Sequence, residues 1–169
     1  MIESRVLLTS FRGSSAEQLI KYANGFDTLV LPNNKFKDAE KLINKIADGT
    51  YNCIFSFGQR PNIKNKVHIE TTARNGVTSV ETDFDCKRLQ KLFESNGVAA
   101  KISHNAGTSY CNSLYFNGLS YIQTNKLKTK MVFIHIPYLK NIYNKEQFFA
   151  NLSETISKIG DENEYRKIL

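Results

Sequence analysis

Short apolar, β-branched runs alternate with amphipathic stretches along most of this chain, and that alternation limits the folds it can adopt. The runs typical of strands are residues 5–11, 28–32, 51–57, 67–73, 98–103 and 131–136. The stretches with helical spacing are residues 15–24, 37–48, 84–95, 109–123 and 144–159. Strands that alternate with helices of this length indicate βαβ units. The sequence therefore predicts an α/β fold with a mostly parallel sheet.

The size and composition of the chain suit one compact globular domain. It has 169 residues, of which 41% are hydrophobic and 23% charged, and it contains no repeat, low-complexity segment or linker. We therefore expect a single domain over residues 1–169. No apolar run reaches the roughly 20 residues that a membrane-spanning helix needs. The N-terminal segment lacks the apolar core and cleavage site of a signal peptide, so the expected location is cytoplasmic.

Cysteine spacing and charge distribution argue against several classes of function. Cys53, Cys86 and Cys111 form no Cys-x-x-Cys pair, which argues against a zinc ribbon and against a disulfide framework. The net charge is +7, but the lysines are scattered among acidic residues and form no basic run interleaved with aromatic residues. We therefore expect a lysine-rich, solvated surface and no nucleic-acid partner.

Cys111 is the cysteine whose context suits a nucleophile. It follows an expected strand and the small-residue turn of residues 105–108, and it lies at the start of an expected helix. The positive end of the helix dipole favours a thiolate there. Unpaired backbone N–H groups in the same first turn can bind an oxyanion. The alternative is a small, buried hydrophobic side chain beneath the turn.

His135 is the candidate general base for that thiol. It lies in the segment Phe-Ile-His-Ile-Pro at the end of an apolar strand, where a polar imidazole needs a partner. A nucleophilic cysteine needs a base that takes its proton and later gives it to the leaving amine. His68 and His104 are alternatives, and so is a histidine that is simply satisfied within the core. A metal site formed by Cys111, His104 and His135 has no supporting ligand spacing.

Glu70 is the candidate third member of the site. It lies in a run of β-branched residues, where an acid is out of place as pure structure. Its carboxylate could hold the imidazole in the right tautomer and stabilise its cation. The structural alternatives are an ion pair with Arg74 and a solvent-facing strand position, and spacing alone does not favour Glu70 over Glu81 or Asp83.

At these residues the sequence resembles the pyroglutamyl peptidase (pyrrolidone-carboxyl peptidase) family of cysteine peptidases. The similar segments correspond, in chain order, to the family's first strand, Gly-Gln pair, glutamate motif, cysteine motif and histidine motif: residues 6–11, 58–59, 70–75, 103–112 and 133–137. The likeness extends from the N-terminus to about Leu139, with the motifs in the same order throughout.

The resemblance implies a three-layer α/β/α sandwich that carries a triad of Cys111, His135 and Glu70. Such enzymes are thiol proteases that remove an N-terminal pyroglutamyl residue from peptides through an acyl-enzyme, so we expect a peptide or small amide as the substrate. The family uses no metal and no other cofactor, and its members often form homo-oligomers. These properties are expectations for this chain.

The segments that would shape the substrate pocket depart from the family pattern more than the triad motifs do. Phe11 and Gln59 match the family's substrate-binding residues, and Arg60 is what remains of a Gly-Gly-Arg segment that could supply positive charge to the oxyanion. After Phe11 the chain reads Arg-Gly-Ser-Ser-Ala, so the second phenylalanine that sandwiches the lactam ring is missing. Two alternatives stay open: the same triad acting on a different small amide, and a non-catalytic binding protein of the same fold.

Overall fold

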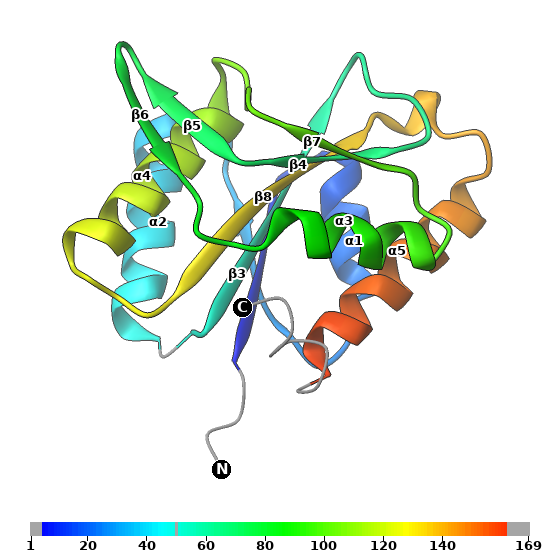
Figure 1. Cartoon of the computed structure of the whole chain (residues 1–169), viewed down its shortest axis with the longest axis horizontal. Helices are drawn as coiled ribbons and strands as arrows, with labels where there is room; N and C mark the ends of the chain where they lie inside the picture. Colours follow the sequence, from blue (N-terminus) through cyan, green and yellow to red (C-terminus); the bar gives the residue numbers. More distant parts are fainter. Residues whose placement is uncertain (1–4, 50, 162–169) are drawn as a thin grey trace.

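A six-stranded sheet of order β2-β1-β3-β8-β4-β7 forms the centre of the molecule, and helices cover both of its faces (Figure 1). The computed structural model describes residues 5–49 and 51–161, so both ends of the expected 1–169 domain lie outside the described residues. The strands of this sheet are β1 (Val6–Phe11), β2 (Asp27–Leu31), β3 (Cys53–Arg60), β4 (Val67–Glu70), β7 (Ala100–Ser103) and β8 (Lys130–Pro137). The helices are α1 (Ser15–Lys21), α2 (Lys35–Asp48), α3 (Cys86–Ser95), α4 (Tyr110–Thr124), α5 (Lys145–Gly160) and the short 3₁₀ helix η1 (Leu139–Asn141).

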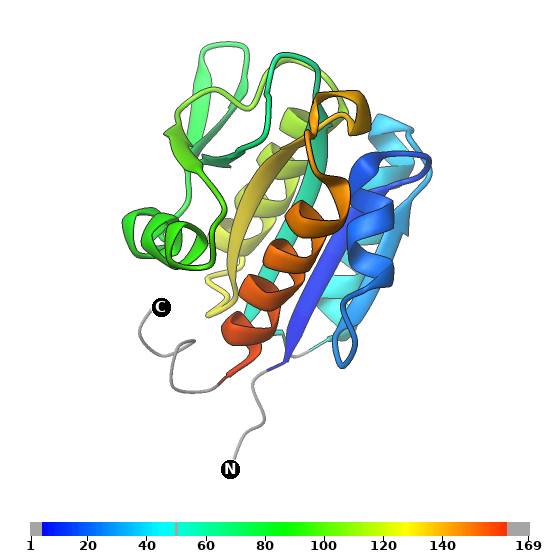
Figure 2. The same cartoon turned by 90° about the vertical axis from the view of Figure 1, so that its right-hand side faces the viewer.

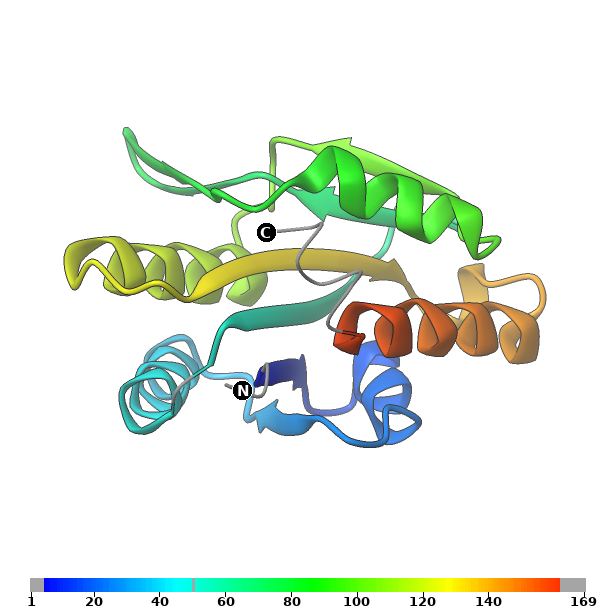
Figure 3. The ribbon, with the colours of Figure 1, turned by 60° about the horizontal axis from the view of Figure 1, so that its bottom comes forward.

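The helices form one layer on each face of the sheet. Helices α2 and α4 cover one face, and α1, α3 and α5 cover the other (Figure 3). Each layer closes over its own apolar core, with Leu42 and Leu114 in the first core and Leu19 and Leu152 in the second. The three-layer α/β/α sandwich implied by the family resemblance is therefore confirmed.

The sheet is mostly parallel, with two strands reversed. Strands β1, β2, β3 and β8 run in the same direction, whereas β4 pairs antiparallel with β8 and β7 pairs parallel with β4. In this register Gly58 of β3 lies beside His135 of β8, and Glu70 of β4 lies beside Phe133 of β8. The reversal of β4 thus brings the end of that strand against the middle of β8.

The expected strand over residues 67–73 is wrong in its second half, because the chain leaves the main sheet after Glu70. Strand β5 (Thr72–Asn75) turns back into β6 (Thr78–Glu81), and the two form a separate antiparallel hairpin. Gly76, the first of the two turn residues, has a φ of 60°, which suits the turns that close tight hairpins. Figures 1 and 2 show this hairpin beyond the main sheet, and β5 packs against α4.

The start of α4 differs from the starts of the other α-helices in the described chain. At α1, α2, α3 and α5 a side chain caps the helix by accepting a hydrogen bond from a first-turn N–H: Ser14, Asn34, Asp85 and Asn144. Ser109, the N-cap of α4, makes no such bond. The first-turn N–H groups of α4 are therefore available to another acceptor.

Candidate active site

A buried carboxylate–imidazole pair lies where β4 and β8 meet. Glu70 Oε1 lies 2.8 Å from His135 Nδ1, although the two residues are 65 positions apart in the chain. The Glu70 side chain is fully buried and that of His135 is 3% exposed. When Nδ1 of a neutral imidazole donates to a carboxylate, Nε2 is the nitrogen that can accept a proton. The pair is therefore arranged as an oriented base.

Cys111 lies on the same face of the sheet as this pair. Its sulfur packs over Gly58, because a Cβ atom built on Gly58 would lie 2.6 Å from it. The ring of Phe133 lies over the same glycine, with Cζ 2.9 Å from that Cβ position, and its centroid is 5.0 Å from the imidazole of His135. Since Gly58 and His135 are register partners, the thiol and the imidazole lie over neighbouring positions of two adjacent strands.

Burial controls the protonation of the Cys111 thiol. The side chain is 8% exposed, and desolvation raises the pKa of the thiol to about 12. The backbone N–H at the helix start lowers the pKa, but its effect is smaller than that of desolvation. The expected preference of the helix start for a thiolate is therefore outweighed by burial, and a thiolate would form here only with a base beside the thiol.

Arg60 links Glu70 to the turn that precedes Cys111. Its Nη1 atom donates to Glu70 Oε1 at 3.2 Å and to the carbonyl oxygen of Asn105 at 2.8 Å. The same carboxylate oxygen thus faces both the guanidinium and the imidazole of His135, whereas Oε2 of Glu70 has no hydrogen-bond partner among the described residues. The arginine offsets the buried negative charge and holds the turn against the strand.

Phe11 and Gln59 both line a pocket beside Cys111, as expected from their places at the ends of β1 and β3. The pocket has a volume of about 270 Å³. Gln59 Oε1 accepts a hydrogen bond of 3.0 Å from the backbone N–H of Ser15, which fixes its side chain against the start of α1. We refer to this cavity as the acyl pocket.

Two residues that follow Cys111 hold the first turns of α4 in place, and sequence reasoning assigned no role to either. Asn112 Oδ1 accepts from the backbone N–H of Arg74 at 2.9 Å, and its Nδ2 donates to the carbonyl oxygen of Arg74 at 2.8 Å. The hydroxyl of Tyr115 donates to the carbonyl oxygen of Glu70 at 2.8 Å. The one available signal was the place of Asn112 directly after Cys111. Arg74 meets α4 through its backbone and forms no ion pair with Glu70 in the described chain.

The other residues considered for the site are placed differently. Nδ1 of His104 hydrogen-bonds a threonine hydroxyl at 2.6 Å. His68 lies opposite His135 in the β4–β8 register, burial lowers its pKa, and neither of its ring nitrogens has a hydrogen-bond partner among the described residues. Glu81 and Asp83 are exposed. Within residues 5–49 and 51–161, no group of three or more His, Cys, Asp or Glu could hold a metal ion. The helices in the same residues also lack the length and apolar character of a membrane span.

Comparison with known sequences points to one family. The family model described as pyroglutamyl peptidase matches residues 61–156, which include Glu70, Cys111 and His135. Pyrrolidone-carboxylate peptidase 2 of Caldanaerobacter subterraneus subsp. tengcongensis is 30% identical over 131 residues, covering 64% of this chain and 63% of that protein. The pyrrolidone-carboxylate peptidase of Oceanobacillus iheyensis is 43% identical over 68 residues, covering 40% of this chain and 34% of that protein. The chain therefore spans less than two thirds of the length of these curated relatives.

Solved structures share the fold over nearly the whole chain. Pyroglutamyl peptidase I of Bacillus amyloliquefaciens superposes with a TM-score of 0.82 at 20% identity, covering 95% of this chain and 97% of that one. The pyrrolidone carboxyl peptidase of Fervidobacterium islandicum also gives a TM-score of 0.82, at 18% identity, covering 98% of this chain and all of that one. At these identities the likeness shows a common fold.

Proposed function

The chain belongs to the pyroglutamyl peptidase family, and we propose that it is a cysteine peptidase that removes an N-terminal pyroglutamyl residue from peptides. One observation carries this proposal: the buried Glu70–His135 pair lies beside a thiol that packs over Gly58, the register partner of the histidine. A nucleophile, an oriented base and an uncapped helix start thus meet at one point of the sheet. Together they are the parts that acyl transfer through a thioester needs.

The first half of the reaction forms the acyl-enzyme. Nε2 of His135 takes the proton of the Cys111 thiol, and the sulfur attacks the carbonyl carbon of the pyroglutamyl residue. The negative charge that develops on the carbonyl oxygen faces the free N–H groups at the start of α4. His135 then gives the proton to the departing amine, the C–N bond breaks, and the thioester remains.

The second half of the reaction regenerates the thiol. His135 takes a proton from water, the resulting hydroxide attacks the thioester carbon, and the C–S bond breaks. Pyroglutamate leaves, and the sulfur recovers its proton from the imidazole. Glu70 is a positioning residue in both halves, because it fixes the tautomer of the imidazole and stabilises the imidazolium. Arg60 Nη1 donates to Glu70 Oε1 and to the carbonyl oxygen of Asn105, and its contribution to the oxyanion stays a prediction from the sequence.

The acyl pocket offers more aromatic surface than the altered segment after Phe11 suggests. Tyr110 and Tyr138 line it together with Phe11 and Gln59. We propose that these rings contact the lactam in place of the missing second phenylalanine, and that Gln59 adds a polar contact. The proposed substrate is therefore a peptide or small amide with an N-terminal pyroglutamyl group.

Release of a chromophore from a pyroglutamyl amide tests the proposal. We expect turnover by the wild-type protein, loss of turnover in Cys111→Ala and turnover close to that of the wild type in Cys86→Ala. Cys86 is the matched control, because it is a buried free cysteine in the core on the other face of the sheet. Release that persists in Cys111→Ala would remove this thiol from the mechanism.

A second candidate is the same triad acting on another small amide, and the polar side of the acyl pocket favours it. Arg12, Ser14 and Asn33 line that side. This candidate predicts that Cys111 is alkylated in the folded protein although pyroglutamyl amides are not turned over. A Cys111 that is inert to both would favour a non-catalytic binding protein of the same fold. Action in the cytoplasm, the absence of a nucleic-acid partner and homo-oligomer formation remain predictions from the sequence.

A further inference from the structure

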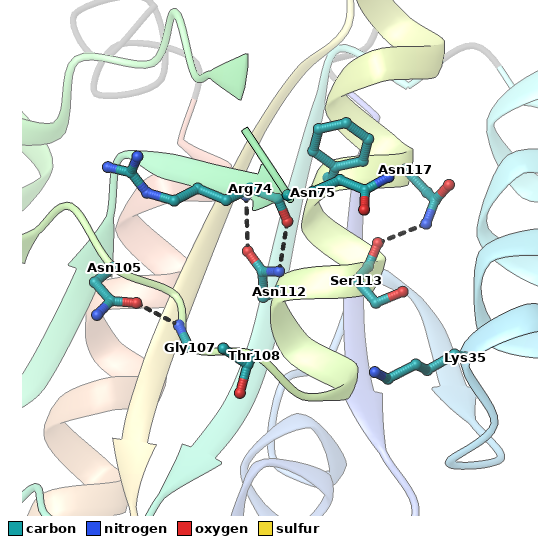
Figure 4. Close-up of a pocket in the computed structure, with 11 residues that line it drawn as sticks. Lys35, Arg74, Asn75, Asn105, Gly107, Thr108, Asn112, Ser113 and Asn117 are labelled. Atoms are coloured by element: carbon teal, nitrogen blue, oxygen red, sulfur yellow. Dashed lines mark hydrogen bonds between the residues drawn. The ribbon is translucent and has the colours of Figure 1, made fainter. Parts of the chain in front are cut away.

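A second pocket, larger than the acyl pocket, adjoins the first turn of α4 (Figure 4). Its volume is about 560 Å³, within the roughly 300–1,000 Å³ typical of small-ligand sites. Residues 109–111 line the acyl pocket, whereas residues 107, 108, 112 and 113 line this one. Because the β5–β6 turn forms one of its walls, we call it the hairpin pocket. Consecutive residues of the segment that carries Cys111 thus line one pocket or the other.

The hairpin pocket carries positive charge without a balancing carboxylate. Its charged lining residues are Lys35, at the start of α2, and Arg74, in β5, and no Asp or Glu lines it. Figure 4 shows these two side chains on opposite sides of Asn112 and Ser113 of α4. Neither cation forms a salt bridge within the part of the chain that the structure describes. An anionic group in this pocket would therefore find a cation toward either side of it and no competing carboxylate in its wall.

Hydrogen bonds hold the walls of the hairpin pocket in place. Asn112 binds both backbone groups of Arg74, so the strand residue that carries the guanidinium is tied to α4. Asn105 accepts from the backbone N–H of Gly107 at 2.9 Å through Oδ1, and its amide N–H groups can donate to a ligand. The pocket is thus rich in donors, with a fixed backbone behind its cations.

We propose that the hairpin pocket binds the peptide segment after the scissile bond and selects a carboxylate there. The inference rests on the proposed function, because the acyl pocket beside Cys111 then holds the pyroglutamyl ring. The leaving peptide departs from the thiol along residues 107–113, which line one pocket or the other, and the hairpin pocket receives it. The carboxylate has two sources, an acidic side chain shortly after the pyroglutamyl residue or the C-terminus of a short peptide.

Four pyroglutamyl tripeptides distinguish these sources. One has alanine at both following positions and an amidated end, so that it has no carboxylate. The second has glutamate after the pyroglutamyl residue, the third has a free C-terminus, and the fourth has lysine in place of glutamate. The readout is the kcat/KM of each charged peptide divided by the kcat/KM of the neutral peptide, measured with the same protein. This ratio cancels any effect of a substitution on the chemical step that is common to all four peptides.

The wild-type protein should favour at least one carboxylate peptide over the neutral and lysine peptides. Lys35→Gln and Arg74→Gln should each reduce the preference about threefold and the double variant about tenfold, as expected for partly exposed ion pairs. Salt at about 0.5 M should weaken the preference, because it screens exposed charges. Lys41→Gln and Arg88→Gln are matched controls, since both residues are exposed cations on helices outside the pocket. They should keep the wild-type preference.

Two results would overturn the inference and leave the proposed function intact. One is turnover of all four peptides by the wild-type protein at similar kcat/KM. The other is a carboxylate preference that the double variant keeps in full, or that the control variants lose to the same extent. If the wild-type protein cleaves none of the four peptides, the proposed function itself fails, and the inference fails with it.

Discussion

A methyl group added at Gly58 should displace the Cys111 thiol. The substitution should lower the activity strongly and the free energy of unfolding only moderately. In Gly58→Ala the new Cβ would lie 2.6 Å from the sulfur and 2.9 Å from Cζ of Phe133. Ordinary contacts of a Cβ atom begin at 3.4 Å. The φ angle of Gly58 is not in the left-handed region, so the substitution acts through steric contact alone.

The size of both effects follows from these distances. The sulfur must retreat by about 1 Å to restore contact distance, and a misplacement of that size can cost about 10²-fold in rate. Overpacking of a core site typically costs about 1–3 kcal/mol in the free energy of unfolding. For a chain of this length, that lowers Tm by roughly 2–4 °C per kcal/mol. The variant should therefore fold and still lose most of its activity.

Gly118→Ala is the matched control for this experiment. It adds the same methyl group to a buried glycine of α4, where the new Cβ would lie 2.6 Å from the sulfur of Met131 and 3.0 Å from Leu42. The flexible Met131 side chain can move aside, and alanine favours a helix over glycine by about 1 kcal/mol. The unfolding free energy should change by a similar or smaller amount than in Gly58→Ala, while kcat stays within about threefold of the wild-type value.

The comparison uses urea unfolding for stability and a chromogenic pyroglutamyl amide for activity. Alkylation of Cys111, followed by mass spectrometry, reports thiol access without relying on turnover. If Gly58→Ala folds and retains the wild-type kcat, the position of the thiol against β3 is not what supports catalysis. If Gly118→Ala loses as much activity as Gly58→Ala, the effect comes from general disturbance of the core.

Three further perturbations test the site. Glu70→Gln removes the charge that orients His135, so kcat should fall by about 10²- to 10⁴-fold with little change in KM; a large rise in KM alone would contradict the positioning role. Desolvation raises the pKa of the folded Cys111 thiol to about 12, from 9.0 in the unfolded chain. The unfolded chain therefore loses the thiol proton first, so the contribution of the buried, protonated thiol to the free energy of unfolding is complete below pH 9.0 and is lost as the pH rises toward 12. Unfolding free energies measured over that range should fall more steeply for the wild-type protein than for Cys111→Ser, and parallel curves would refute the assignment. Asn112→Ala removes both hydrogen bonds to the hairpin backbone and should cost about 1–2 kcal/mol in unfolding free energy, whereas Asn117→Ala removes one bond within α4 and should cost less.

Local sequence patterns predicted most of the fold, because hydrophobic periodicity and the residues that begin or end helices and strands are local features. The helix expected over 37–48 is observed at Lys35–Asp48, and the strand expected over 131–136 is observed at Lys130–Pro137. The direction of β4 was not predictable in this way, since an apolar run reads the same in a parallel and an antiparallel pair. The β5–β6 hairpin was missed although the Asn75-Gly76 pair, a dipeptide that signals a tight turn, lies within this segment.

The residues of the candidate site could be predicted where a short sequence motif surrounds them. Cys111 and His135 stood out by their segments, whereas Glu70 could not be separated from other acids by spacing, and the structure places it against the imidazole through the reversed β4. The close approach of the sulfur to Gly58 and the raised pKa of the thiol both depend on how α4 packs on the sheet. Packing of this kind links residues far apart in sequence, so no local pattern encodes it.

The position of β8 has a consequence for how this protein is made. It is the last strand of the described chain, yet it lies between β3 and β4 in the sheet. Until a ribosome has synthesised β8, no strand joins the group β2-β1-β3 to the pair β4-β7. Each of these two parts of the sheet then keeps an open, apolar edge. The arrival of β8 closes both edges and delivers His135 in the same step. Recovery of the proposed peptidase activity during refolding should therefore report the closure of the sheet and cannot precede it.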